Sequence, residues 1–398
     1  MMENIFYSSI KEFKTQSTTI NSTKSIVPFS NFHIFVGFSD GYWVLFDSLA
    51  NKIINEGKIS GDPNKCLTLF HSVRALDENT IIFVNADHCQ LSALNPYTGE
   101  LHKKWKHKVP TIEALPKEKR SDVQKVDKAF AGLDIQVLKK SQKVGVLETV
   151  PTVNGENQYL VTVFNEDKLE CQLKYSNLER NPMRLRPGDD ENIFILYSLK
   201  PREGKLYMLD TREKFEEFRI FNIEPAPGIY FALYPWGEGE IVLFGNPDRG
   251  GKPSQIVYNF FHRESTVIPM NCYNEGTTLK SVFSADPVRK RALLMESNKD
   301  GVYLSIWNAS FNRVEFAREA EYAKQIVSST SNEYFVEYNN NQVQKATTMK
   351  LVVSRLVTKK MFFIHLMKHA IYNNKRLIEV HGKADVLRDV ANMLSFIV

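Results

Sequence analysis

The pentapeptide Leu304-Ser305-Ile306-Trp307-Asn308 is an apolar run that ends in an aromatic residue followed by Asn. Similar runs, each ending in an aromatic residue or Leu followed by Asp or Asn, lie at residues 43–47, 91–95, 161–165, 206–210 and 255–259. We call the Asp or Asn of each run its marker; the steps between successive markers are 48, 70, 45, 49 and 49 residues. Self-similarity at a fixed spacing indicates repeated supersecondary units. The chain is therefore expected to be a repeat protein with one insertion.

Each repeat contains further strand-like segments beside its marker run. An apolar run precedes the marker run in most repeats, at residues 33–38, 80–85, 192–197, 240–244 and 291–295. Turns rich in Asp, Asn and Gly follow these runs, and Gly and Asn supply the positive φ that tight hairpins need. Another run follows the marker, as at residues 100–105 and 215–221. Repeats of about 40–50 residues with four strands are typical of propeller blades. We predict an all-β fold, an approximately seven-bladed β-propeller of four-stranded blades with a short C-terminal helix.

The two ends of the chain are expected to complete this architecture. Residues 333–338, 349–354 and 361–365 fit a weaker seventh repeat without a marker. Residues 1–27 form an N-terminal segment that could supply a strand to the last blade and close the ring, which removes an exposed edge. The propeller then spans residues 28–367, and residues 368–398 form a C-terminal extension. Six apolar residues of this extension share one face of an amphipathic helix: Val386, Leu387, Val390, Met393, Leu394 and Ile397. An irregular sandwich with evenly spaced strands is the alternative fold.

Composition favours a folded protein in a reducing compartment. The chain has 398 residues, of which 43% are hydrophobic, enough to build a core. Its four cysteines are scattered without the paired spacing of a disulfide framework or zinc site. The N-terminus lacks the pattern of a signal peptide, and no stretch approaches the roughly 18–20 apolar residues of a membrane span. We therefore expect an intracellular protein, cytoplasmic or nuclear, without a transmembrane segment.

The marker runs carry a resemblance to known propellers. Trp307-Asn308 resembles the Trp-Asp dipeptide of WD-repeat propellers, and Phe46-Asp47, Phe164-Asn165 and Leu209-Asp210 are similar to weakened versions of it. The turn at residues 95–100, Asn-Pro-Tyr-Thr-Gly-Glu, is similar to the repeats of quinoprotein-like propellers. The Gly-His pair that often opens a WD repeat is absent. The resemblance covers roughly residues 28–367, and it implies a non-catalytic interaction scaffold, an adaptor or a subunit of a larger complex, which binds other proteins through a propeller rim.

The longest step between markers contains a basic insertion at about residues 106–131. Residues 102–128 hold nine Lys or Arg against four Asp or Glu, whereas the rest of the chain is neutral. In a propeller, such a connection between blades leaves from the same rim as the turns between second and third strands. The candidate partner-binding residues on this rim are Lys106, Lys108, Lys117, Lys119, Arg120, Lys125, Arg202, Arg249, Lys252 and Lys299. They could form a docking arm for an acidic partner, or a solvated loop.

Two other functions stay open as alternatives. The first is a binder of nucleic acid or another polyanion through the insertion, with steep salt dependence. Nucleic acid is the less favoured partner, because only Trp105 and Phe130 flank the insertion as stacking platforms. The second is a propeller enzyme with a site in the central channel.

Motifs for catalysis or cofactor binding were not found in the sequence. Residues 245–254 are similar to a phosphate loop, but the Lys is displaced and Pro253 stands where a hydroxyl residue is needed, so we interpret them as a hairpin turn. His365 and His369 lie four residues apart but are too few for a zinc site. No Gly-x-Ser-x-Gly elbow is present. We therefore expect no catalytic residues, no metal and no cofactor.

Overall fold

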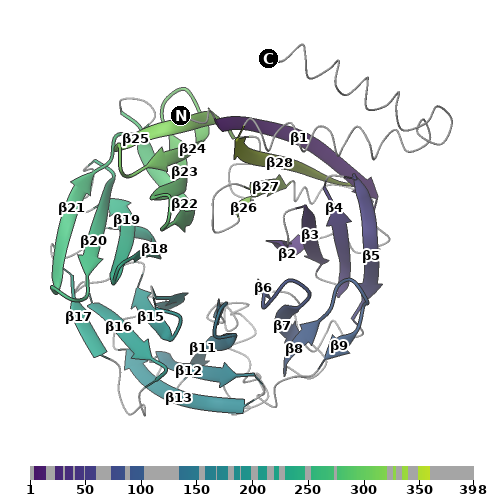
Figure 1. Cartoon of the computed structure of the whole chain (residues 1–398), viewed down its shortest axis with the longest axis horizontal. Helices are drawn as coiled ribbons and strands as arrows, with labels where there is room; N and C mark the ends of the chain where they lie inside the picture. The colour runs from purple at the N-terminus through teal and green to yellow at the C-terminus, as the bar shows by residue number, and fades with distance from the viewer. Residues whose placement is uncertain are drawn as a thin grey trace.

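The chain folds as a ring of seven β-sheets. The computed structural model describes residues 4–14, 23–29, 32–38, 41–48, 50–59, 73–85, 90–102, 134–151, 157–166, 168–177, 183–188, 190–198, 205–212, 219–223, 229–246, 252–272, 276–320, 326–328, 334–338 and 348–358. These residues form seven four-stranded antiparallel sheets placed around a central axis (Figure 1). The prediction of an all-β, seven-bladed propeller is confirmed.

The sheets are blades 1 to 7 in chain order, and the strands of each blade follow one another from the centre of the ring outward (Figure 1). Blades 1 to 3 consist of β2 (Thr23–Pro28), β3 (His33–Phe38), β4 (Tyr42–Asp47) and β5 (Lys52–Lys58); β6 (Arg74–Ala75), β7 (Ile81–Asn85), β8 (Gln90–Leu94) and β9 (Leu101–His102); and β10 (Asp134–Leu138), β11 (Lys143–Pro151), β12 (Asn157–Asn165) and β13 (Lys168–Asn177). Blades 4 and 5 consist of β14 (Met183–Pro187), β15 (Ile193–Ser198), β16 (Lys205–Asp210) and β17 (Arg219–Asn222); and β18 (Ile229–Gly237), β19 (Glu240–Asn246), β20 (Ser254–Asn259) and β21 (Glu264–Pro269). Blades 6 and 7 consist of β22 (Thr278–Asp286), β23 (Arg291–Ser297), β24 (Val302–Asn308) and β25 (Arg313–Glu319); and β26 (Ile326–Ser328), β27 (Tyr334–Tyr338), β28 (Thr348–Thr358) and β1 (Asn4–Lys14).

The last blade joins the two ends of the described chain. Its outermost strand is β1, which pairs antiparallel with β28 from Asn4 opposite Thr358 to Lys14 opposite Thr348. The Ser8 and Ser354 hydroxyls add a hydrogen bond of 2.7 Å between the same two strands. Because the next strand, β2, is the innermost strand of blade 1, residues from the N-terminus contribute to both the last and the first sheet. The ring is thus closed by strand pairing, without a helix or disulfide among the described residues.

The repeated marker has a structural role in the turn after the third strand. The Asn259 carboxamide oxygen accepts hydrogen bonds from the backbone N–H groups of Phe261 and His262, at 2.9 and 3.1 Å. Asp47, Asn95, Asp210 and Asn308 accept equivalent bonds in their own blades. In four of these turns the residue four positions after the marker has positive φ: Asn51, Gly99, Arg263 and Asn312. The sequence repeat is therefore an Asx turn that reverses the chain between the third and fourth strands.

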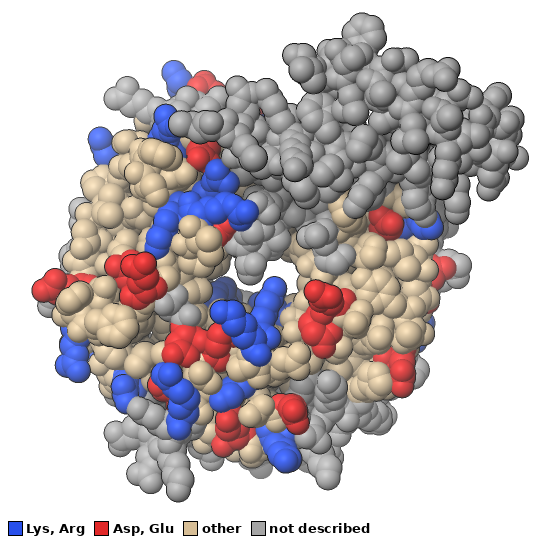
Figure 2. All heavy atoms as spheres, in the orientation of Figure 1, with Lys and Arg blue, Asp and Glu red and all other residues tan. Residues whose placement is uncertain are grey.

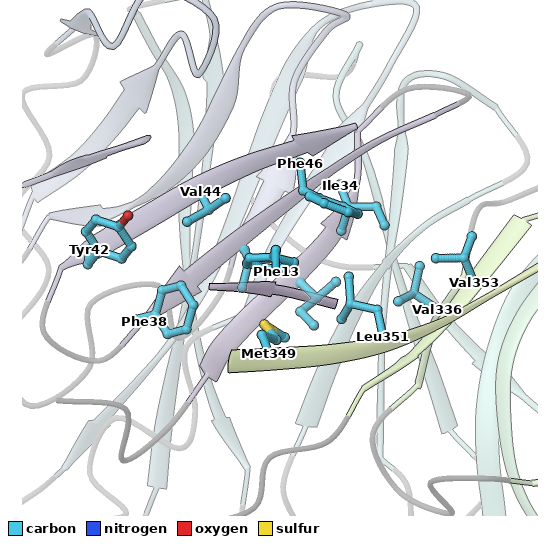
Figure 3. Close-up of a cluster of buried hydrophobic side chains, with 12 residues drawn as sticks. Phe13, Ile34, Phe38, Tyr42, Val44, Phe46, Val336, Met349, Leu351 and Val353 are labelled. Atoms are coloured by element: carbon cyan, nitrogen blue, oxygen red, sulfur yellow. The ribbon is translucent and has the colours of Figure 1, made fainter. Parts of the chain in front are cut away.

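The hydrophobic core lies between neighbouring blades. In blade 1, Val44 and Phe46 of β4 pack toward blade 7, whereas Trp43 and Leu45 of the same strand pack toward blade 2. Figure 3 shows the first of these clusters, in which Phe13 stacks on Phe46 with ring centroids 4.7 Å apart. Third strands are buried on both faces, and this explains why the marker runs are mostly apolar instead of alternating with exposed polar residues. The polar residues within these runs are buried as well: Ser92, Thr162, Gln255 and Ser305.

Several sequence predictions fall outside the described residues. These are the basic insertion, the strand at residues 361–365 and the C-terminal helix; the described residues contain no helix. The segment similar to a phosphate loop connects β19 to β20, which pair antiparallel with Gly245 opposite Ser254, and it is therefore a hairpin connection. No helix in the described part of the chain is long and apolar enough to cross a membrane.

Candidate functional site

The predicted binding residues are only partly covered by the described ranges. Lys252 and Lys299 are exposed and lie at the connections between second and third strands, in blades 5 and 6. The other eight lie outside the described residues: Lys106, Lys108, Lys117, Lys119, Arg120, Lys125, Arg202 and Arg249. The docking arm formed by the insertion therefore stays a prediction.

A charged cluster that the sequence did not predict lies on the innermost strands of blades 2, 3 and 4. Asp134 of β10 accepts hydrogen bonds from Arg74 of β6 at 3.4 Å and from Arg186 of β14 at 3.1 Å. Its two carboxylate oxygens also accept bonds from the Gln136 amide at 2.8 Å and from the Leu185 backbone N–H at 3.3 Å. Each oxygen thus has two donors, so the acceptor capacity of the carboxylate is nearly filled.

The arginines of this cluster are more accessible than the carboxylate that they surround. The side chains of Arg74 and Arg186 are 40% and 25% exposed, whereas that of Asp134 is 7% exposed. Arg184 lies two residues before Arg186 on the same strand and is half-buried. Figure 2 shows an opening in the middle of the ring with Lys or Arg side chains at its lower side and Asp or Glu side chains close by. Arg74, Arg184 and Arg186 thus lie on innermost strands, the part of each blade nearest the central channel, and are partly exposed.

The positive charges of the arginines in this cluster oppose one another. Burial lowers the pKa of Arg74, Asp134 acts in the opposite direction, and the positive charges of Arg186 and Arg184 lower it further. Burial also disfavours the charged form of Arg186, but Tyr197 and Asp134 outweigh this effect and raise its pKa. Arginine stays protonated in proteins, so the cluster has three positive charges against one negative charge.

Two tyrosines form the adjoining wall without adding charge. Tyr197 of β15 lies opposite Arg184, and the Tyr234 hydroxyl of β18 donates a hydrogen bond of 3.2 Å to the Val282 carbonyl of blade 6. Burial raises the pKa of both tyrosines, although Arg186 favours their ionised forms. Both hydroxyls are therefore neutral at pH 7, and the cluster keeps its net positive charge.

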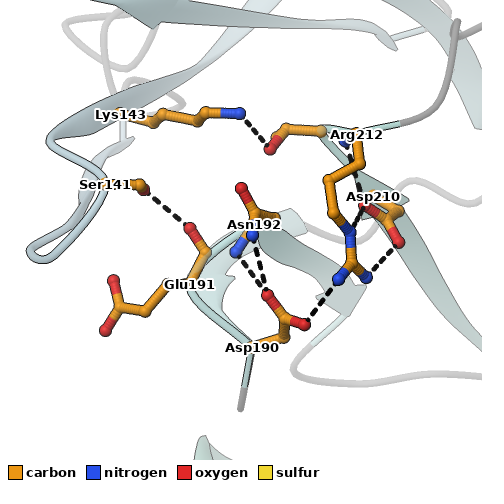
Figure 4. Close-up of polar contacts among 8 residues, drawn as sticks. Ser141, Lys143, Asp190, Glu191, Asn192, Asp210 and Arg212 are labelled. Atoms are coloured by element: carbon orange, nitrogen blue, oxygen red, sulfur yellow. Dashed lines mark hydrogen bonds and ion pairs between the residues drawn. The ribbon is translucent and has the colours of Figure 1, made fainter.

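A second polar cluster holds blades 3 and 4 together (Figure 4). The Lys143 ammonium donates a hydrogen bond of 2.8 Å to the Thr211 hydroxyl, and the Ser141 hydroxyl donates one of 2.7 Å to the Glu191 carbonyl. Arg212 bridges Asp210 and Asp190 at 2.6 and 2.9 Å. Almost all these groups have partners within the cluster, so its role is to fix the turns of two neighbouring blades.

Three large apolar side chains are exposed on the turns of blades 5 and 6. Phe261, Val288 and Phe311 are 78%, 88% and 65% exposed, and they lie between β20 and β21, between β22 and β23, and between β24 and β25. We call these three side chains, with Arg263, Arg289 and Arg313 of the same turns, the turn surface. Large exposed apolar groups that lie together on a folded protein often mark a binding surface.

Contacts between the turns show that they lie on one rim. The Phe260 backbone N–H donates to the Gly239 carbonyl at 3.0 Å, and the Lys290 ammonium reaches the Trp236 carbonyl in the preceding blade. The Ala309 N–H donates to the Lys290 carbonyl at 2.8 Å. The turns that carry the three apolar side chains are thus linked from blade 5 into blade 6.

The two described thiols, Cys171 and Cys272, lie in partly buried positions that disfavour the thiolate. Burial raises the pKa of Cys171 to about 11 and that of Cys272 to about 12, with nearby Glu170 and Glu296 adding to the effect. Both thiols are therefore protonated at neutral pH and weakly nucleophilic. Within the described ranges, no three His, Cys, Asp or Glu side chains are placed to hold a metal ion.

Comparison with known proteins leaves the family open. No protein-family model matches the chain, and no curated protein matches it. The WD-repeat and quinoprotein resemblances therefore stay expectations from the marker runs, whereas the propeller architecture is established by the sheets themselves.

Proposed function

We propose that this chain is a non-catalytic protein-interaction scaffold that binds a partner protein through the turn surface. The exposure of Phe261, Val288 and Phe311 on linked turns of one rim is the observation that supports this function best. A closed ring of sheets is a rigid support, and binding residues are commonly carried on loops that such supports hold.

The chemistry of the turn surface indicates the kind of partner. Aromatic residues and arginine are enriched where proteins bind one another, and a few such side chains supply most of the binding energy. Here each of the three turns that exposes an apolar side chain also carries an arginine in or next to it, Arg263, Arg289 or Arg313, and the Arg313 guanidinium lies over the Phe311 ring at 5.2 Å. A fitting partner has an apolar patch with carboxylates around it.

Affinity purification of the full-length chain from its native cells tests the proposal. We expect that a double variant, Val288→Ser with Phe311→Ser, loses the partner proteins retained by the unmodified chain. Leu169→Ser is the matched control, because Leu169 is 57% exposed but lies on the outermost strand of blade 3. Equal recovery of every partner with the double variant and with the control would refute binding at the turn surface.

The same experiment tests the basic insertion as an alternative surface. A variant that lacks residues 107–130 should keep its partners if they bind the turn surface. Partners lost only on this deletion would place the binding site on the insertion instead. Recovery of nucleic acid alone, released by moderate salt, would favour the polyanion alternative, because phosphate contacts weaken steeply with salt.

A further inference from the structure

We propose that Arg74, Arg184 and Arg186, the channel arginines, bind an anion of the phosphate-monoester class in the central channel. The site lies on the inner strands of blades 2 and 4, away from the turns that carry the turn surface. It therefore does not depend on the protein-binding function proposed above.

The first argument is charge. Two guanidinium groups, those of Arg74 and Arg186, pair with one carboxylate, and Arg184 adds a third positive charge two residues before Arg186 on the same strand. The two neighbouring tyrosines are neutral at pH 7. Like charges held close together in a partly desolvated site repel one another, and a cleft with low-dielectric walls strengthens the field that attracts an anion. The net charge of the cluster is +2, which matches the charge of −1.5 to −2 that a phosphate monoester carries at about pH 7.

The second argument is hydrogen-bonding capacity. Within the described part of the chain, Arg74 donates to Asp134 and to the Val73 carbonyl, and Arg186 donates to Asp134 and to the Leu185 carbonyl. A guanidinium group has five N–H donors. The Asp134 carboxylate already accepts four hydrogen bonds. Most guanidinium donors are thus available to an added acceptor, whereas the Asp134 carboxylate has little capacity left to accept further hydrogen bonds.

The third argument is geometry. Arg74 and Arg186 bond to opposite oxygens of one carboxylate, so Asp134 fixes both guanidinium groups in place from behind. Both side chains are partly exposed and lie on innermost strands of their blades, next to the central channel. Planar guanidinium forks favour groups that present several oxygens, and phosphate is bound by such arginine pairs through parallel hydrogen bonds. A site already held in its binding arrangement loses little conformational entropy on binding.

Isothermal titration of the full-length chain with inorganic phosphate tests the proposal. We expect saturable binding that weakens about tenfold or more in Arg74→Gln, the usual effect of losing a charge-assisted hydrogen bond. Arg184→Gln is the second variant, since Arg184 is not among the residues that bond Asp134 and its replacement should disturb the fold least. Arg313→Gln removes one positive charge from the turn surface and is the matched control. Urea unfolding of each variant shows whether it is folded.

Asp134→Asn separates binding from a purely structural role. The substitution raises the net charge of the cluster, so phosphate should bind more tightly, although the fold is destabilised. If the arginines serve only to support Asp134, the variant would not bind phosphate more tightly. Absence of phosphate binding to the unmodified chain, or equal weakening by Arg74→Gln and Arg313→Gln, would overturn the proposal.

Two further ligands distinguish the source of the phosphate group. Methyl phosphate represents a small phosphorylated metabolite, and an acetylated Gly-phosphoserine-Gly peptide represents a phosphorylated side chain, with the unphosphorylated peptide as its control. Tighter binding of the phosphopeptide than of methyl phosphate would indicate a phosphorylated protein segment as the ligand. The reverse order would indicate a small molecule, and both orders support the site.

Discussion

Strand β1 closes the ring, and Phe13 is the buried side chain through which its contribution can be measured. The Phe13 ring is 7% exposed, stacks on Phe46 and packs with Met349 and Leu351 in the cluster between blades 7 and 1. Core Phe→Ala substitutions cost about 3–5 kcal/mol, of which a stacked aromatic pair contributes about 0.5–1.5 kcal/mol. We expect Phe13→Ala to lower the free energy of unfolding by about 3–4 kcal/mol, because the cavity is enclosed by two blades.

Equilibrium unfolding in urea, followed by tryptophan fluorescence, measures this effect. Trp43 is buried in blade 1, next to the blade that β1 completes, and Trp307 is buried in blade 6. Their fluorescence therefore reports on unfolding in two different parts of the ring. The midpoint should fall without a change in slope if the ring unfolds as one unit. Phe311→Ala is the control for the loss of a ring, because Phe311 is exposed and its removal should cost less than about 1 kcal/mol. Equal destabilisation by the two substitutions would show that β1 does not seal the last blade.

Three further predictions concern the turns, the thiols and a surface ion pair. Asn95→Ala removes the acceptor of the Tyr97 and Thr98 backbone bonds and should cost about 0.5–1.5 kcal/mol in urea unfolding, whereas Asn95→Asp, which keeps the acceptor, should cost less. Alkylation of Cys171 and Cys272 by iodoacetamide, followed by mass spectrometry, should be slow at pH 7 and accelerate toward the raised pKa values of about 11 and about 12; fast labelling at pH 7 would contradict their burial. The hydrogen bond from Arg212 lowers the pKa of Asp210 below its usual value of 3.8. The pair therefore stabilises the fold fully above about pH 3.8, and this stabilisation is lost as the pH falls through the lowered pKa. Arg212→Ala should therefore be slightly less stable than the unmodified chain at pH 7 and equally stable in strong acid, as measured by urea unfolding at both pH values.

The fold could be predicted from the sequence because the repeat has a local physical cause. Five of the six markers accept hydrogen bonds from backbone groups two or three residues later, as Asn259 does from Phe261. Each marker run is mostly apolar because the third strand is buried on both faces. Both properties leave a mark within a few consecutive residues, so the regular spacing of the markers can be read from the sequence although the Gly-His pair of WD repeats is absent.

The channel cluster could not be predicted for the opposite reason. Arg74 and Asp134 lie 60 residues apart, with the basic insertion between them, and they meet only because adjacent blades share a channel. Their inner strands are short, β6 being two residues long, and short strands carry no readable alternation of polar and apolar residues. The exposure of Phe261 could not be predicted from its residue type, because an aromatic residue beside an apolar run is usually assigned to the core. Phe261 is exposed because it lies in the turn that the Asn259 side chain stabilises.

The rigidity of the ring determines how its two proposed sites relate to each other. Coupling between sites requires an element with two arrangements that both ligands favour to different extents. The channel arginines belong to blades 2 and 4, whereas the turn surface belongs to blades 5 and 6, and every described strand of these blades is paired within its own four-stranded sheet. The Tyr234 hydroxyl bond to the Val282 carbonyl further joins blade 5 to blade 6 in one arrangement. Phosphate in the channel should therefore leave the affinity of a partner at the turn surface unchanged, and by thermodynamic reciprocity the partner should leave phosphate binding unchanged.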